Sequence, residues 1–190
     1  MNFNGIANYI FELNALKKFE HSGFKLAGIK NPDTIAEHVQ RTCIIGYILA
    51  KLENADTEKV LLSCLIHDNG EARITDLHKV AARYIDSKGP EARAFAEQSD
   101  SLPKEIAQIF KICFEEYSER KTPEGIISRD ADLLEVAFQA KEYLDLGHKA
   151  CQNWIDNVGK ALKTASARKI FREMAKTDFT DWWHNLKKIS

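Results

Sequence analysis

Apolar residues recur along this chain at the three- and four-residue spacing of amphipathic helices. Between residues 6 and 18, one helical face would carry Ile6, Tyr9, Ile10, Leu13 and Leu16. No stretch alternates apolar and polar residues as a strand would, and only four prolines and nine glycines interrupt the chain. The pattern therefore predicts an all-α protein.

Helix-start signals divide this pattern into successive helices. After a loop over 20–32, Asp33 or Thr34 caps a long helix that ends near Leu52, and Asp56 opens the next. Further helices are expected at Leu77–Ile85, near Pro90, after Pro103, from Pro123 to about Gly147, and around Trp154, Ile170-Phe171 and Trp182-Trp183. No repeat or linker divides the 190 residues, so we expect one compact single-domain helical bundle over 1–190.

Composition narrows the choice of partners. A net charge of −1 gives no global attraction to nucleic acid or to an anionic membrane, so neither is expected as a partner. No apolar run reaches the roughly 20 residues that span a bilayer, and the first five residues lack the basic start of a signal peptide. The four cysteines are far apart and form no CxxC pair. We interpret them as reduced thiols in a cytoplasmic protein.

The first candidate functional residues are the adjacent pair His67-Asp68, which follow the apolar run 60–66. Burying a carboxylate is strongly unfavourable unless it is paired or bound to a metal. Neighbouring residues diverge by about 100° on a helix, but Asn69-Gly70 indicate a helix end, where both side chains can meet one ion. His38, one turn into its own helix, supplies a second imidazole. This arrangement predicts a divalent metal site.

The fourth ligand is Asp130 or Asp132. The two residues are about 200° apart on a helix, so only one of them faces the metal. Apolar neighbours on the inward face favour Asp132. Two nitrogens and two oxygens suit one divalent ion, of Mn, Co, Fe, Ni, Zn or Mg, better than Ca.

Other polar residues near these ligands have two interpretations each. Glu71 is either a general base that activates water or a surface charge. Asp76 is either catalytic or the cap of the helix that follows it. Arg41 either contacts an anionic ligand or pairs with Glu37. Trp154 is expected to pack in the core or at an interface.

The ordered set His38 … His67-Asp68-x-x-Glu71 … Asp132 resembles the HD-domain metal-dependent phosphohydrolases. Residues 31–38, 67–76 and 130–135 are similar to its 5′-deoxynucleotidase-like branch, and the match covers most of the first 145 residues. The resemblance implies an HD-type helical fold with a metal-site core at about 30–145 and helices at 150–190 packed on it. It also implies one divalent metal, a homodimer, and hydrolysis of (deoxy)nucleoside 5′-monophosphates to nucleoside and phosphate.

The substrate loop differs from the pattern of that branch, which has an arginine and a tryptophan before the first histidine. The stretch here reads His21-Ser22-Gly23-Phe24-Lys25, where Phe24 replaces the tryptophan as a stacking surface. His21, Lys25 or Arg41 would then hold the phosphate. The alternatives are an HD hydrolase of another nucleotide (a diesterase, a triphosphohydrolase or a guanosine tetraphosphate hydrolase) and a non-catalytic helical dimer that binds a nucleotide or a partner.

Overall fold

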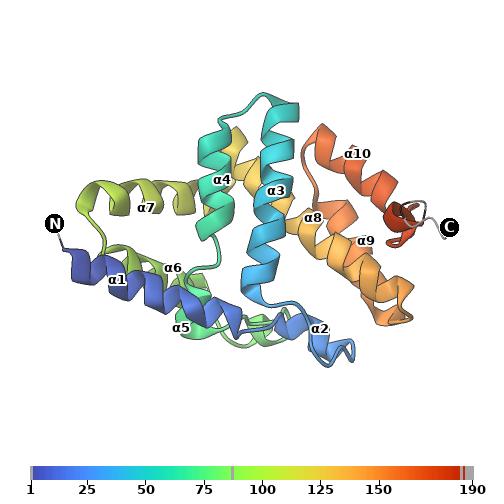
Figure 1. Ribbon diagram of the computed structural model, residues 1–190, viewed down its shortest axis with the longest axis horizontal. Coiled ribbons are helices and arrows are strands. Elements are labelled where there is room, and N and C mark those ends of the chain that lie inside the picture. The colour runs from blue at the N-terminus through green and yellow to red at the C-terminus, as the bar shows by residue number, and fades with distance from the viewer. Residues whose placement is uncertain (1, 87, 185, 187–190) are drawn as a thin grey trace.

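The computed structural model describes residues 2–86, 88–184 and 186, and within these ranges it contains helices and no strands (Figure 1). The α-helices are α1 Phe3–Glu12, α2 Ser22–Leu26, α3 Ile35–Glu53, α4 Thr57–Ile66, α5 Glu71–Ile74, α6 Lys88–Ser99, α7 Lys104–Glu119, α8 Pro123–Asp145, α9 Gln152–Ala161 and α10 Ala165–Met174. Short 3-10 turns are η1 Leu13–Lys17, η2 Ala81–Arg83, η3 Lys149–Cys151 and η4 Asp181–Trp183. The prediction of an all-α fold is confirmed.

Side-chain caps explain why the two longest helices begin where they do. At the start of α3, Thr34 accepts a hydrogen bond from the backbone of Glu37, and the Glu37 carboxylate accepts one from the backbone of Thr34 at 2.7 Å. At the start of α8, Thr122 caps Gly125, and Pro123 occupies the first turn, where its missing N–H has no consequence. Of the two caps considered for α3, the structure uses Thr34.

Four sequence-based helix assignments were wrong, and three of them lie before Lys88. The first predicted helix is divided into α1 and η1, the loop over 20–32 contains α2, and the helix expected at Leu77–Ile85 is only the turn η2. Tertiary hydrogen bonds explain the last error. The backbone N–H of His78 donates to Ser22 Oγ, and Asp76 accepts from Ser22, so the start of this segment is bonded to α2 and only residues 81–83 form a helical turn. The segment Trp182-Trp183 forms only η4, and both indoles are exposed.

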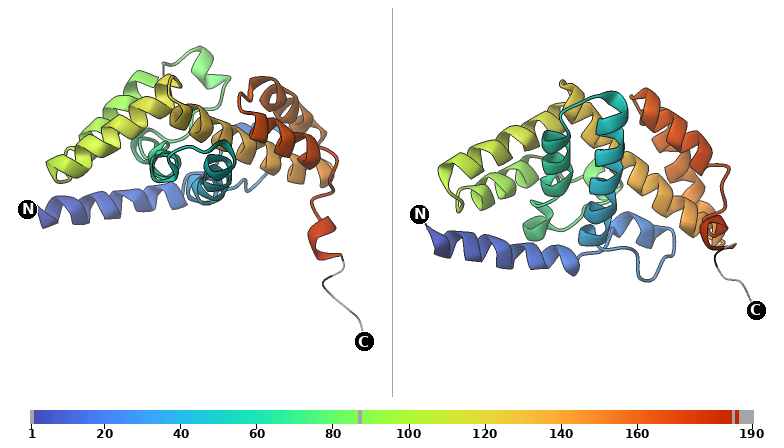
Figure 2. Two further views of the ribbon diagram at one scale, coloured as in Figure 1. Left: turned by 90° about the horizontal axis from the view of Figure 1, so that it is seen from above. Right: turned by 45° about the horizontal axis from the view of Figure 1, so that its top comes forward.

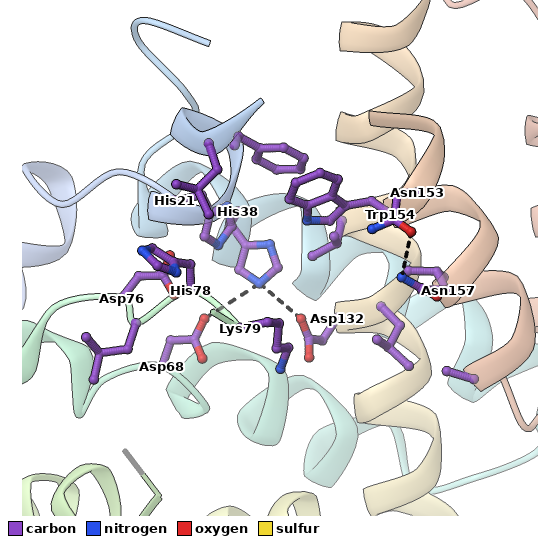
Figure 3. A pocket seen from close by; sticks show the side chains of 18 of the residues that line it. His21, His38, Asp68, Asp76, His78, Lys79, Asp132, Asn153, Trp154 and Asn157 are labelled. Carbon is purple, nitrogen blue, oxygen red and sulfur yellow. Dashed lines mark hydrogen bonds and ion pairs between the residues drawn. The ribbon is translucent and has the colours of Figure 1, made fainter. Parts of the chain in front are cut away.

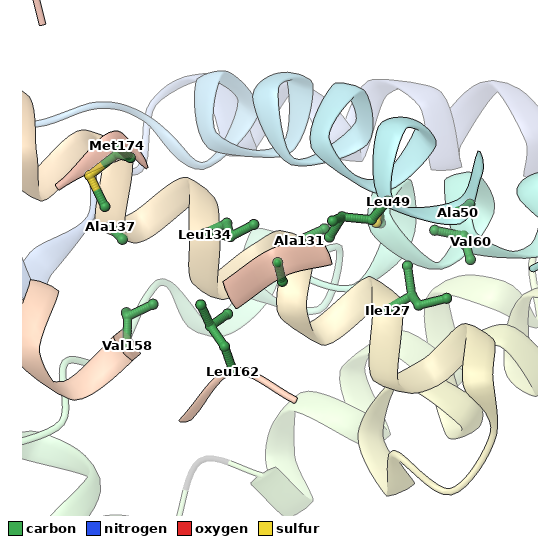
Figure 4. Packing of buried hydrophobic residues seen from close by; sticks show 12 residues of the cluster. Leu49, Ala50, Val60, Ile127, Ala131, Leu134, Ala137, Val158, Leu162 and Met174 are labelled. Carbon is green, nitrogen blue, oxygen red and sulfur yellow. The ribbon is translucent and has the colours of Figure 1, made fainter. Parts of the chain in front are cut away.

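Helix α8 is the centre of the fold and packs on α3, α4, α7, α9 and α10. Figure 2 shows α6 and α7 at one end of α8 and α9 and α10 at the other. The main core cluster lies along α8, where Ile127, Ala131, Leu134 and Ala137 are at most 2% exposed (Figure 4). Its remaining buried members are Leu49, Ala50, Val60, Cys64, Val158, Leu162, Ala167 and Met174.

The packing brings three segments to one point inside the molecule. The first turn of α3, the end of α4 and the middle of α8 meet there, and each contributes at least one of the predicted ligands. None of the helices in the described ranges is both long and apolar enough to cross a membrane.

Candidate metal centre and its cavity

The four predicted metal ligands converge. Nε2 of His38 lies 3.3 Å from Nε2 of His67, 3.6 Å from Oδ2 of Asp68 and 3.4 Å from Oδ1 of Asp132. His67 Nε2 lies 3.1 Å from Asp68 Oδ2 and 4.0 Å from Asp132 Oδ1. Because α4 ends at Ile66 and His67 is its C-cap, the backbone turns there and both His67 and Asp68 face the same point.

These separations fit a shared divalent ion. At ligand distances of about 2.1 Å, neighbouring donor atoms around one ion are about 3.0–3.4 Å apart. Donor atoms of His38, His67 and Asp132 lie within 4.8 Å of one another, and all three residues are buried. Two imidazole nitrogens and two carboxylate oxygens are a donor set for transition metals and Mg rather than for Ca. The residues present therefore fit a metal.

Buried hydrogen bonds orient both imidazoles toward this point. His67 Nδ1 donates to the backbone carbonyl of Cys64 at 2.7 Å, which leaves Nε2 for a metal. His38 Nδ1 donates to Glu135, which is 1% exposed. Arg41 donates through Nε to the other oxygen of Glu135 at 2.8 Å. Such outer partners fix the tautomer and raise the basicity of a ligating histidine.

Arg41 is not brought to the site. Its guanidinium contacts Glu135, Glu142 at 2.6 Å and Gln139 at 2.7 Å, and it does not line the cavity described below. The sequence suggested either an anionic ligand or Glu37 as the partner of Arg41. Its partners in the structure are instead Glu135, Glu142 and Gln139. Its role in the structure is to neutralise the carboxylate that holds His38.

Asp132, and not Asp130, faces the two histidines in the structure. Oδ2 of Asp132 accepts a hydrogen bond from Tyr117 at 2.7 Å and one from Arg129, while Oδ1 faces the histidines. Burial alone would raise the pKa of Asp132, but the charge of Arg129 and the bond to His38 hold it well below the usual range. Asp130 points away and accepts hydrogen bonds from the backbone of Lys163 and Thr164 in the connection between α9 and α10.

A second carboxylate cluster adjoins the four ligands. Ligand oxygens of Asp68, Glu71 and Glu91 lie within 4.8 Å of one another, and Glu71 Oε2 is buried without a hydrogen-bond partner. Burial and the negative charges of Asp68 and Asp76 raise the pKa of Glu71 to about 11. Burial and the charge of Asp68 raise the pKa of Glu91 to about 7. A cation bound here would favour the charged forms of these groups.

A cavity of about 500 Å³ opens beside the ligands (Figure 3). This volume is within the range of small-molecule sites. Its polar lining includes His38, Asp68 and Asp132 together with Glu71 and Asp76. Its apolar lining includes Leu133 and Val136 of α8, and Trp154, Val158 and Ala161 of α9.

The predicted substrate residues are divided between the cavity and the surface. His21 and Phe24 line the cavity, where Asp33 accepts a hydrogen bond from His21 at 2.7 Å and Phe24 stacks on Trp154 with ring centroids 5.4 Å apart. Phe24 is only 2% exposed, so it acts first as packing. Lys25 pairs with Glu20 at 2.5 Å and does not line the cavity.

Several lining residues were not predicted as site residues from the sequence. They include the charged or polar side chains of His78, Lys79, Arg129, Asn153 and Asn157, and the indole of Trp154. The position of Arg129 could have been predicted, because it lies three residues before Asp132 and therefore on the same side of the helix. The others reach the cavity through tertiary packing of α9 and the segment after α5.

Comparison with known proteins gives a consistent family assignment. Residues 13–175 match the HD domain family. A 5′-deoxynucleotidase from Dictyostelium discoideum is 27% identical over 142 residues, which cover 70% of this chain and 75% of the relative. A 5′-deoxynucleotidase from Danio rerio is 25% identical over 139 residues, which cover 70% of this chain and 67% of the relative.

Solved structures agree with this assignment. A conserved hypothetical protein from Pyrococcus furiosus superposes with a TM-score of 0.76 and 30% identity, covering 90% of this chain and 99% of that one. The family match spans most of the chain and includes all four converging residues. This chain therefore belongs to the HD domain family.

Proposed function

We propose that this protein is a metal-dependent phosphomonoesterase that hydrolyses (deoxy)nucleoside 5′-monophosphates to nucleoside and phosphate. One observation carries the proposal. The donor atoms of His38, His67, Asp68 and Asp132 converge at the end of a cavity that also holds the unpaired carboxylate oxygen of Glu71. The similarity to two 5′-deoxynucleotidases supports the choice of substrate class.

The four converging residues would hold one divalent ion. When bound, such an ion lowers the pKa of water and polarises a phosphoryl oxygen. The donor set suits Mn, Co, Fe, Ni, Zn or Mg, and the metal that restores activity to stripped protein identifies the functional one.

Glu71 is the proposed general base. Its Oε2 atom is buried and has no partner, so it can accept a hydrogen bond from an attacking water. Burial and neighbouring carboxylates raise the pKa of Glu71, which makes it a stronger proton acceptor once it is ionised. Asp76 lines the same end of the cavity, and Ser22 fixes its orientation through a 2.6 Å hydrogen bond from the backbone N–H. We place Asp76 beside the leaving 5′-oxygen.

Cations that line the cavity would stabilise the phosphate. Lys79 and Arg129 line the cavity, as do the imidazoles of His21 and His78. We propose Lys79 and Arg129 as the groups that neutralise the charge developing on the phosphate oxygens. Lys25 and Arg41 are paired elsewhere, with Glu20 and Glu135 respectively, and are not part of this proposal.

Phosphate release by Glu71→Gln tests the catalytic role. Protein stripped of metal and reloaded with each candidate ion is given deoxy and ribo 5′-mono-, di- and triphosphates. We expect wild-type protein to release phosphate from monophosphates, and Glu71→Gln to lose about 10²–10⁴-fold in turnover while it still binds metal. Glu115→Gln, an exposed residue of α7 away from the cavity, is the matched control.

Two results would contradict the proposal. One is full activity in Glu71→Gln. The other is stoichiometric metal binding by wild-type protein without release from any monophosphate. Release from diphosphates or triphosphates alone would favour another HD hydrolase activity.

The proposal includes a homodimer in the cytoplasm. Exposed apolar side chains on α3, at Ile44, Tyr47 and Ile48, support an interface with a second copy. The four free cysteines, three of them buried, support a reducing compartment. Light scattering on protein that elutes from a size-exclusion column measures the molecular mass in solution and tests the dimer.

A further inference from the structure

The cavity continues beyond the part that phosphate chemistry needs. Its lining also includes apolar side chains of α8 and α9, among them Leu133, Val136 and Val158. The indole of Trp154 adds a flat aromatic wall, which is fixed because it stacks on the buried ring of Phe24 at an interplanar angle of 28°. A pocket with apolar walls beside an ionic centre suits a ligand with one charged end and one flat, apolar end.

Two side-chain amides interrupt these apolar walls. Asn153 and Asn157 are one turn apart on α9, and both line the cavity (Figure 3). Asn157 Nδ2 donates to Asn153 Oδ1 at 3.3 Å. This bond leaves the amide N–H groups of Asn153 and the carbonyl oxygen of Asn157 for a ligand. The pair therefore offers a donor and an acceptor side by side.

Nucleobases match this combination. Each base has flat faces that stack on aromatic and apolar groups and an edge on which donors and acceptors adjoin, as adenine shows in its pairing with asparagine. We propose that α9 is the base-recognition element of this site, in which the amides of Asn153 and Asn157 bind the edge of the base beside Trp154. The inference rests on the nucleotide substrate of the proposed function and assigns the residues that hold its base.

A pair of residues about 100° around α9 from the amides provides a matched control. Gln152 Nε2 donates to Asp156 Oδ1 at 2.8 Å, with the same four-residue spacing as the amide pair. Both residues are exposed, and neither lines the cavity. Removing this pair changes the helix surface as much as removing the amides, but it takes nothing from the cavity.

Calorimetric binding of the four 2′-deoxynucleosides tests the inference without turnover. The proteins are wild type, Asn153→Ala/Asn157→Ala and Gln152→Ala/Asp156→Ala, each loaded with Mn. The probe without a base is 2-deoxyribose 5-phosphate. We expect the amide double variant to weaken binding of at least one nucleoside by about 10-fold or more, the range of a bidentate amide–base contact. Binding of the baseless phosphate, and all binding by the control variant, should be unchanged.

Three results would overturn the inference: nucleoside binding as tight in the amide variant as in wild type, equal weakening in the control variant, or no nucleoside binding by wild type. Failure of the proposed function gives a different result. If the nucleosides bind in an amide-dependent manner but no monophosphate is hydrolysed, the base site stands and the phosphatase activity falls.

Discussion

At the scale of single residues, Glu135 determines how His38 presents its ring. Glu135 accepts a hydrogen bond from His38 Nδ1 and is neutralised by Arg41. We predict that Glu135→Gln weakens metal affinity by about 10–100-fold, because it removes the charge that orients and polarises the ligand. Metal titration with a competing chelator measures the affinity, and thermal unfolding of the metal-free protein checks the fold.

Glu142→Gln is the control for this prediction. Glu142 also accepts a hydrogen bond from Arg41, at 2.6 Å, but it is not a partner of His38. An equal loss of metal affinity in both variants would show that Arg41, and not the carboxylate on His38, is responsible.

The residue types and their order in the sequence predicted which residues converge. An adjacent His67-Asp68 pair after an apolar run has few explanations other than a metal site. The partners of these ligands could not be predicted in the same way. Glu91 follows Gly89-Pro90 in a segment that reads as polar surface. It reaches Glu71 only because α6 packs on the turn at Gly70, where an added Cβ would lie 2.8 Å from the Glu91 carbonyl oxygen. Such contacts depend on tertiary packing.

At the scale of helices, a glycine allows α3 to approach α4. A Cβ at Gly46 would lie 2.6 Å from Cys64 Sγ and 3.3 Å from Val60 Cγ1. Alanine at a helical position gains up to about 1 kcal/mol over glycine, whereas overpacking a core costs about 1–3 kcal/mol. We predict that Gly46→Ala lowers the free energy of unfolding by about 1–2 kcal/mol, as measured in urea.

The double variant Gly46→Ala/Cys64→Ala separates the clash from other effects, because it removes the sulfur that the new methyl group meets. We expect it to lose less stability than the sum of the two single variants. Strict additivity would show that close packing at this position does not explain the glycine.

Another element-scale contact joins α1 to α5 and α6. Glu12 accepts hydrogen bonds from Arg73 at 2.5 Å and from Gln98 at 2.7 Å. The bond to Arg73 lowers the pKa of Glu12 below its ordinary value of 4.5. Because the folded-state pKa is depressed, this contact stabilises the fold above the unfolded pKa, and the stabilisation is lost as the pH falls through the folded one.

We therefore predict that Glu12→Gln lowers stability by about 0.5–1 kcal/mol at neutral pH and that the difference from wild type narrows in acid. Urea unfolding at a series of pH values measures it. Glu97→Gln is the control, since Glu97 contacts only Nη1 of Arg73 and is more exposed. A difference that persists unchanged at the lowest pH would exclude this ion pair as the cause.

Helix positions were predicted well where local signals decide them. The sequence placed the starts of α3, α4 and α8 at Asp33 or Thr34, at Asp56 and at Pro123. In the structure the caps of these helices are Thr34, Asp56 and Thr122. The segment after Asp76 was not predicted, because its backbone bonds to Ser22 across 56 positions of sequence. The residues of α9 that line the cavity were not predicted either, because they too reach it through contacts between segments far apart in the sequence.

At the scale of the whole molecule, the candidate metal centre joins separate parts of the fold. Its four residues come from α3, the end of α4 and α8, so a bound ion would connect three segments that are otherwise held by the apolar core. An ion that binds the folded chain and not the unfolded one stabilises it by about 2.7 kcal/mol at a concentration of 100 times Kd.

For a chain of this length, that stabilisation corresponds to a rise in Tm of roughly 5–10 °C. We predict such a rise when Mn is added to EDTA-treated protein, and no rise in His67→Ala, which lacks a ligand whose Nε2 is 3.1 Å from Asp68. Calorimetry over a range of metal concentrations tests both, because mass action requires the Tm of wild type to keep increasing with free metal. If the Tm of wild type is the same in EDTA and in saturating metal, the four residues do not bind an ion that links these helices.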